Sequence, residues 1–259
     1  MKRILLAFLA MAAFSACDKP NQEEDPILPG TYESGAVSSA YMNGPMKYTV
    51  WLPAGYDASK SYPFLYLLHG AGDDEKSWNS KGGASKIADR YIHDGGKPMV
   101  IVMPDAKLTF YIGEYLPDKG EYAYESYFHK ELMAKVEADY HCNGKRAVAG
   151  LSMGGYGTLY YVLKYPQKFT YGYAMSPATD LNGFHALIGE QPDKGVFPPV
   201  TLESGLSDWT IPFKDVEACY EMLKSDGLDC TLVQRSGGHD WGFWPVCLEK
   251  ALVQVAKTF

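Results

Sequence analysis

The stretch Arg146-Ala147-Val148-Ala149-Gly150-Leu151-Ser152-Met153-Gly154-Gly155 decides the fold of this chain. Its first four residues predict a short buried strand, and the residues after it predict a helix that continues to about Tyr165, before Pro166. Between the two lies a Gly-x-Ser-x-Gly pattern. A sharp strand-to-helix turn of this kind projects the serine hydroxyl above a sheet, and its crowding demands glycine two residues on either side. We therefore predict Ser152 as a nucleophile.

Strands and helices alternate along the rest of the chain. Apolar runs predict buried strands at 63–68, 98–103, 169–175, 200–203 and 230–234, and helical spacing predicts helices at 83–93, 122–140, 213–225 and 244–257. Asn43-Gly44 between 38–43 and 46–52 is typical of a hairpin. This order predicts an α/β protein with a mostly parallel central sheet and helices on both faces.

A serine hydroxyl needs a base to take its proton, and the base needs an acceptor to orient it. Of the six histidines, only His239 follows a late strand, in a glycine-rich loop, and comes after every good acid candidate. Asp208 follows the strand at 200–203 and is the favoured acid, with Asp180 as its main rival. We predict Ser152, Asp208 and His239 as a catalytic triad.

Acyl transfer also requires donors for a developing oxyanion. One backbone N–H is expected from Met153, which follows the nucleophile, and the second from Ala71, in the loop after His69-Gly70. Gly70 and Gly72 allow this backbone a close approach. We expect His69 itself to be a packed structural residue.

The first residues predict export. Lys2 and Arg3 precede an apolar run that is too short to span a bilayer, and Phe14-Ser15-Ala16-Cys17 resembles a bacterial lipobox. We expect a signal peptide over 1–16, a lipidated Cys17, a polar tether over 17–30 and an esterase domain over 31–259. Such a protein would sit in the bacterial cell envelope, with Cys17 as its sole contact with the membrane; simple cleavage after Ala16 is the alternative.

Net charge and cysteine spacing indicate which partners and cofactors to expect. A formal charge of −7 makes nucleic acid a poor partner. The cysteines Cys142, Cys219, Cys230 and Cys247 lack metal-ligand spacing, so we expect no metal and no organic cofactor. Cys219 with Cys230 is the best candidate for a disulfide, although buried free thiols are the commoner outcome.

Four short segments in this order resemble the esterase D and feruloyl esterase group, carbohydrate esterase family one of the α/β-hydrolase superfamily. They are Tyr66–Gly70, Pro98–Pro104, Ala147–Gly155 and Gly237–Trp241. The resemblance implies a serine carboxylesterase acting on hydroxycinnamoyl or acetyl esters of plant polysaccharide such as xylan, with the triad and oxyanion donors at the positions named above. Only about 25 residues separate the strands at 169–175 and 200–203, so the cap should be short.

Aromatic side chains that could line the cleft and stack on an acyl group or sugar are Trp78, Phe110, Tyr111, Trp209 and Trp241. Other functions stay open at this point. A siderophore trilactone esterase or a thioester hydrolase would use the same chemistry, and a glycan-binding lipoprotein without catalysis would use the same scaffold.

Overall fold

The computed structural model describes residues 25–113, 115–116, 120–192 and 196–259. The predicted signal peptide and Cys17 lie outside these residues. Two sheets are present in the described ranges, one of eight strands and one of two. The strands are β1 Thr31–Ser39, β2 Gly44–Leu52, β3 Tyr62–Leu68, β4 Val100–Pro104, β5 Tyr115–Leu116, β6 Gly120–Glu121, β7 Cys142–Leu151, β8 Tyr171–Met175, β9 Val200–Gly205 and β10 Cys230–Arg235.

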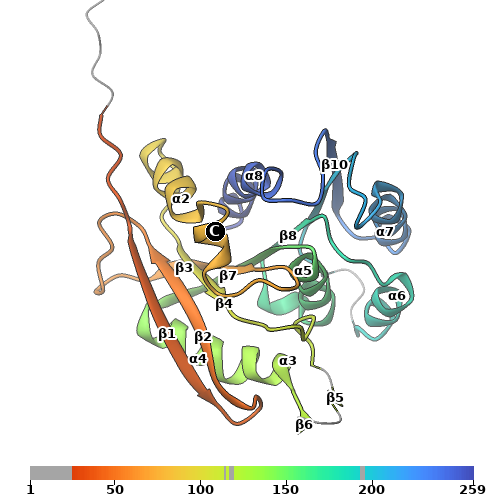
Figure 1. Cartoon of the computed structure of the whole chain (residues 1–259), viewed down its shortest axis with the longest axis horizontal. Coiled ribbons are helices and arrows are strands. Elements are labelled where there is room, and N and C mark those ends of the chain that lie inside the picture. The colour runs from red at the N-terminus through yellow and green to blue at the C-terminus, as the bar shows by residue number, and fades with distance from the viewer. Residues whose placement is uncertain (1–24, 114, 117–119, 193–195) are drawn as a thin grey trace, which may run out of the picture.

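The eight-stranded sheet has the order β1-β2-β4-β3-β7-β8-β9-β10 (Figure 1). β1 pairs with β2, and β2 with β4, in antiparallel register, whereas every pair from β4 to β10 is parallel. The parallel strands β3, β4 and β8 are almost wholly buried, as is the second half of β7 from Ala147 to Leu151, as expected when helices cover both faces. This is the predicted α/β-hydrolase fold.

Helices cover the sheet on its two faces. They are α1 Ser77–Ser80, α2 Ala84–His93, α3 Tyr124–Tyr127, η1 Phe128–Leu132, α4 Met133–Asp139, α5 Met153–Lys164, η2 Pro166–Lys168, α6 Leu181–Gly189, α7 Phe213–Ser225 and α8 Trp244–Ala256. One hydrophobic cluster joins the sheet to α3–α7, and a second joins it to α1, α2 and α8. None of the described helices is long and apolar enough to cross a membrane.

Three local features depart from the predicted elements. The hairpin is present, but its first strand is β1 at Thr31–Ser39, and residues 40–43, predicted as part of that strand, form the turn. The helix expected at 122–140 is interrupted by the π-helical turn η1. The stretch between β8 and β9, expected as a short cap, contains α6, which packs against α5 and α7. Asp180 directly precedes α6, and its Oδ1 accepts the N–H of Gly183 at 3.0 Å, so this rival acid is a helix cap.

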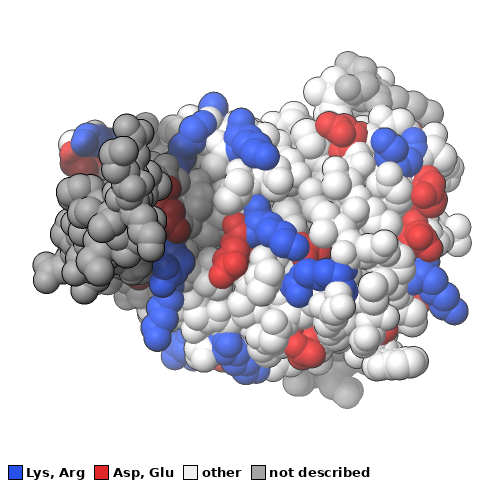
Figure 2. Space-filling model, turned by 90° about the horizontal axis from the view of Figure 1, so that it is seen from above, with Lys and Arg blue, Asp and Glu red and all other residues white. Residues whose placement is uncertain are grey.

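The face formed by α2 and α8 carries the N-terminal end of the described chain. Asp25 O lies 3.0 Å from His93 Nε2, and Gly30 N–H donates to Asp89 Oδ1 at 2.7 Å. Seen from above, the molecule shows lysine and arginine side chains interspersed with acidic ones (Figure 2). An open groove of about 710 Å³ is lined by α2, by the turn that follows it at 94–97 and by the second half of α8.

Candidate active site

Ser152 stands at a sharp turn between β7 and α5. Its φ of 54° and ψ of −115° are rarely adopted by residues other than glycine. A Cβ on Gly150 would lie 2.4 Å from Gly154 O, and one on Gly154 would lie 2.5 Å from Leu68 O. Both positions therefore require glycine, because β7, the turn and β3 pack too closely for any side chain. The turn leaves Ser152 partly exposed at the carboxyl end of the central strands.

The structure brings Ser152, His239 and Asp208 together from three distant segments. His239 Nε2 lies 2.9 Å from Ser152 Oγ, and His239 Nδ1 lies 2.8 Å from Asp208 Oδ2. The Asp208 carboxylate is fully buried, whereas 13% of the His239 side chain is exposed. A hydroxyl, an imidazole and a carboxylate linked in this order can move a proton off the serine.

The second oxygen of Asp208 fixes the direction of the carboxylate. Asp208 Oδ1 accepts the backbone N–H groups of Thr210 at 3.0 Å and Ile211 at 2.8 Å. Oδ2 is thereby left facing His239. An ionised carboxylate so placed favours the tautomer that keeps the proton on Nδ1, which leaves Nε2 free to accept the serine proton.

The loop that carries His239 is held by the buried carboxylate of Glu203 and the partly buried guanidinium of Arg235. Arg235 Nε lies 2.6 Å from Glu203 Oε1, and its guanidinium stacks 3.4 Å from the Phe243 ring centroid and also donates to Phe243 O. Burial would raise the pKa of Glu203, but hydrogen bonds from Lys250, Tyr173 and Arg235 outweigh burial and lower it. Sequence reasoning missed this network; its signal was an acid, Glu203, within a buried strand that has no other charged residue.

The two predicted oxyanion donors flank the nucleophile. Met153 is the first residue of α5, where an N–H has no partner within the helix. Ala71 follows Gly70, whose Cβ, if present, would lie 3.5 Å from Ser152 Cβ. Over the ranges that the structure describes, neither N–H donates a hydrogen bond to a protein acceptor. Both are thus free to donate to a substrate oxygen.

The five aromatic residues predicted to line the cleft divide into core residues and more exposed ones. The prediction was wrong for two of the five, Trp78 and Tyr111. Trp78 is 1% exposed and donates through Nε1 to Leu68 O at 2.9 Å, and Tyr111 has no exposed surface. Both belong to the core, so neither presents a ring to a ligand. Phe110 is 37% and Trp209 92% exposed, and Trp241 is partly buried against Trp78. These three remain candidates for stacking.

The cysteines adopt the commoner of the two outcomes considered, and the candidate disulfide between Cys219 and Cys230 is not formed. Cys142, Cys219, Cys230 and Cys247 are free thiols in the described residues. Burial raises the pKa of Cys219 to about 12 and that of Cys230 to about 11, which keeps these two in the unreactive thiol form. No group of three His, Cys, Asp or Glu side chains in the described parts of the chain is placed to hold a metal ion.

The fold and this arrangement define a member of the α/β-hydrolase superfamily. Comparison with known proteins identifies the family within it. A profile of the Esterase family matches residues 39–254. The chain belongs to this family and is a carboxylic ester hydrolase. The resemblance to the feruloyl esterase group is confirmed by its relatives and by the solved structures that it matches.

Two curated relatives and one solved structure show the similarity. The chain is 30% identical over 222 residues to an endo-1,4-beta-xylanase/feruloyl esterase of Xylanibacter ruminicola, covering 80% of this chain and 29% of that protein. It is 25% identical over 241 residues to an acetyl esterase of Caldicellulosiruptor saccharolyticus, covering 77% of this chain and 85% of that protein. The chain thus spans less than a third of the length of the first protein. A solved ferulic acid esterase superposes with a TM-score of 0.79 at 27% identity, covering 89% of this chain and 99% of that one.

Proposed function

We propose that this enzyme removes feruloyl or acetyl ester substituents from plant polysaccharides such as xylan, through an acyl-enzyme. The hydrogen-bonded chain from Asp208 through His239 to Ser152 Oγ carries the chemical part of the proposal. The substrate class rests on the names of the relatives, which are a xylanase/feruloyl esterase and an acetyl esterase. Phe110 and Trp209 supply exposed aromatic surface suited to an acyl ring or a sugar face.

The reaction follows from the geometry in two steps. In the first, Ser152 Oγ attacks the ester carbonyl while His239 Nε2 takes its proton and passes it to the departing sugar alkoxide. In the second, water gives a proton to His239 and attacks the acyl-serine; the acid leaves as the bond to Ser152 Oγ breaks, and His239 returns the proton to Oγ. Asp208 stabilises the imidazolium in both steps. The N–H groups of Met153 and Ala71 hold the negative oxygen, each contributing about 2.7–4 kcal/mol to the transition state.

Replacement of the nucleophile tests the mechanism. Ser152→Ala should lower kcat for p-nitrophenyl acetate by at least about 10³-fold and abolish labelling by a fluorophosphonate, with little change in Tm. Ser207→Ala, at an exposed serine beside the Asp208 loop, is the matched control and should keep both activities. Retention of most activity by Ser152→Ala would refute the mechanism. A wild-type chain that binds xylo-oligomers without labelling or turnover would instead be a glycan-binding module.

A substrate panel tests the acyl group. Release of ferulate from methyl ferulate and feruloylated arabinoxylan is compared with release of acetate from acetylated xylo-oligomers, using wild type and Ser152→Ala. A preference of at least tenfold in kcat/KM for either series identifies the acyl group. Turnover of p-nitrophenyl acetate without release from either carbohydrate series would contradict the proposed substrate class.

We further propose that the protein is exported and anchored in the cell envelope through a lipidated Cys17. The basic start, the apolar run and the small residues before Cys17 support this proposal. Cys17→Ala in the full-length chain should move the protein from the membrane fraction to the soluble fraction. An unchanged distribution would exclude the anchor.

A further inference from the structure

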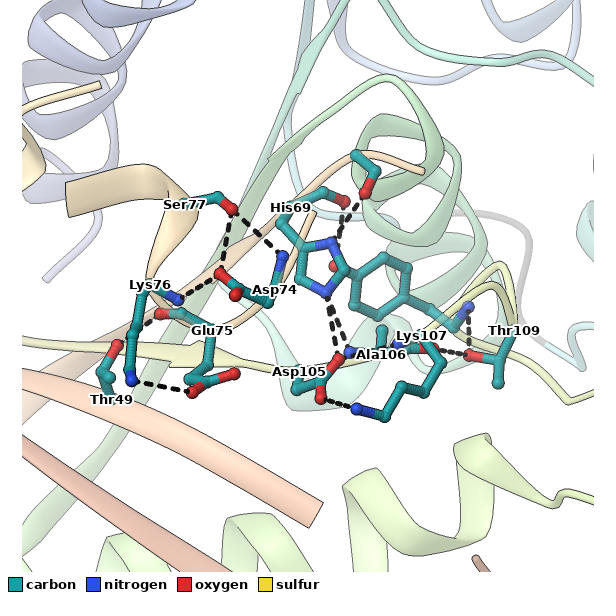
Figure 3. A network of polar contacts seen from close by, with 12 residues as sticks. Thr49, His69, Asp74, Glu75, Lys76, Ser77, Asp105, Ala106, Lys107 and Thr109 are labelled. Atoms are coloured by element: carbon teal, nitrogen blue, oxygen red, sulfur yellow. Dashed lines mark hydrogen bonds and ion pairs between the residues drawn. The ribbon is translucent and has the colours of Figure 1, made fainter. Parts of the chain in front are cut away.

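His69 precedes the loop that carries Ala71, and both of its ring nitrogens make polar contacts (Figure 3). The residue is 1% exposed. Its Nδ1 lies 2.7 Å from Gly70 O, and the backbone N–H of Ala106 donates to its Nε2 at 2.9 Å. The imidazole therefore connects the turn after β3 to the loop after β4.

These contacts select one tautomer of the imidazole. A backbone N–H can only donate, so Nε2 must present its lone pair to Ala106. Gly70 O can only accept, so Nδ1 must carry the proton. The nearby Asp105 does not change this assignment, because its Oδ1 lies 3.8 Å from Nε2, beyond hydrogen-bonding distance. Its carboxylate is instead held by the ammonium and the backbone N–H of Lys107.

The bond to Gly70 O also determines where the Ala71 N–H points. Gly70 C=O and Ala71 N–H belong to one planar trans peptide, in which the two groups face opposite directions. His69 Nδ1–H and the Asp73 N–H, at 3.2 Å, both hold the carbonyl on the protein side. The Ala71 N–H must then face away from His69, on the exposed side of the loop.

We propose that His69 is a positioning residue for catalysis: its neutral, Nδ1-protonated ring holds the Gly70–Ala71 peptide so that the Ala71 N–H meets the substrate oxyanion. The inference rests on the proposed function, in which this N–H stabilises the tetrahedral intermediate. Without the bond from Nδ1, the peptide between Gly70 and Ala71 is held by the weaker bond from Asp73 alone. Gly70, which flanks this peptide, would then allow it to rotate, because a glycine tolerates a wide range of backbone angles.

The surroundings of His69 prevent its ring from turning. The backbone carbonyl of His69 accepts a hydrogen bond from the Tyr111 hydroxyl at 3.0 Å. The His69 ring contacts the Tyr111 ring edge-on, with 5.9 Å between the ring centroids. The Tyr111 carbonyl is held in turn by the Tyr161 hydroxyl at 2.6 Å. The loop from Ala106 to Tyr111 contains three non-glycine residues with positive φ. A loop in so restricted a conformation is a rigid support for the imidazole.

Two amide substitutions separate the roles of the two ring nitrogens. In His69→Asn the side-chain NH₂ occupies nearly the place of Nδ1 and can still donate to Gly70 O, but the acceptor for Ala106 is lost. In His69→Gln the amide oxygen can reach the Ala106 N–H, but the donor to Gly70 O is lost. His129→Gln is the matched control, because it removes another imidazole, half-buried against Tyr165 and outside the site.

The expected result is a difference in turnover between the two variants. For p-nitrophenyl acetate, His69→Gln should lower kcat by about 10²-fold, as loss of an oxyanion donor does, with KM within threefold of wild type. His69→Asn and His129→Gln should stay within tenfold of wild type. A phenylboronate, which forms a tetrahedral adduct with the serine, should bind His69→Gln more weakly by a similar factor. Tm is measured for every variant.

Two outcomes would overturn the inference. One is that the wild-type enzyme is active and the kcat of His69→Gln lies within threefold of the wild-type kcat. The other is equal loss of kcat in His69→Asn and His69→Gln that follows their Tm values. A wild-type chain without turnover or fluorophosphonate labelling would remove the proposed function itself, which distinguishes the two failures. If His69→Gln does not fold, ¹⁵N spectra of the wild-type imidazole decide: a proton on Nδ1 at pH 7 supports the inference, and a proton on Nε2 overturns it.

Discussion

Replacing Asp208 with asparagine isolates its orienting role, because the structure determines which way the new amide would face. Asp208 accepts two backbone N–H groups, from Thr210 and Ile211, on one oxygen and the His239 ring on the other. If the amide oxygen stays on the backbone side, its NH₂ faces Nδ1. The imidazole must then place its lone pair on Nδ1 and its proton on Nε2, where it cannot accept the proton of Ser152.

The cost of the opposite amide orientation sets the size of the effect. Turning the NH₂ toward Thr210 and Ile211 would forfeit two hydrogen bonds, each contributing about 0.5–1.5 kcal/mol. The unproductive arrangement is therefore favoured by about 1–3 kcal/mol, or about 5- to 150-fold. The charge that stabilises the His239 imidazolium is lost as well. Serine hydrolases with this substitution lose about 10⁴ in kcat, so we expect kcat of Asp208→Asn to fall by about 10³- to 10⁴-fold.

The assay is steady-state hydrolysis of p-nitrophenyl acetate at pH 7, with thermal unfolding followed by circular dichroism. KM and Tm should change little, because the substitution is isosteric. Asp240→Asn is the matched control: this neighbour of His239 accepts the N–H groups of Gly242 and Phe243, so its variant should stay near wild-type activity. A folded Asp208→Asn enzyme with kcat within tenfold of wild type would refute the orienting role.

Three further substitutions probe packing, titration and the cleft. Gly150→Ala would place a methyl group 2.4 Å from Gly154 O, so we expect about 1–3 kcal/mol of destabilisation and a Tm lower by several degrees, and an unchanged Tm would show that the turn can relax. Burial, and then Lys168, lower the pKa of His129 to about 3. The unfolded chain therefore takes up this proton first as pH falls below about 6.5, and the group should cost about 2 kcal/mol of stability at pH 5 relative to pH 7. Urea titrations at pH 5 and pH 7 should show that the free energy of unfolding of His129→Gln lacks this pH dependence. An equal change in unfolding free energy with pH in wild type and His129→Gln would contradict the low pKa of His129. Trp209→Ala, at a 92% exposed ring, should leave Tm unchanged and raise KM for methyl ferulate several-fold but not for p-nitrophenyl acetate, whereas equal KM values would remove Trp209 from the acyl site.

The fold could be predicted because its signals are local. Buried parallel strands appear as continuous apolar runs, and the Gly-x-Ser-x-Gly turn joins a strand to a helix in one short stretch. The helix at Phe213–Ser225 has the predicted bounds. The helix α6 was missed because its short segment follows Asp180, a residue that was considered as a catalytic acid. Both functions place an aspartate directly after a strand, and only the tertiary structure distinguishes a cap from an acid.

The candidate site could be predicted where chain order constrains it. Ser152, Asp208 and His239 occur in the order that this fold uses, and the structure brings their side chains together. The cleft aromatics could not be predicted equally well, because an aromatic near a site motif is as suitable for the core as for a ligand. Trp78 and Tyr111 fill the core, and nothing in their local sequence distinguishes them from Trp209.

The residues that hold the catalytic loops are the least visible in the sequence, although Glu203 and His69 are almost wholly buried. Glu203 and Arg235 are 32 positions apart, and His69 and Ala106 are 37 apart. A buried polar group costs free energy unless a partner satisfies it, so each of these contacts persists because the fold supplies that partner. Neither contact touches the reacting atoms, yet one fixes the loop of the general base and the other fixes the peptide of an oxyanion donor. The reacting groups are set by short motifs, whereas their alignment depends on polar pairs that only the folded sheet brings into contact.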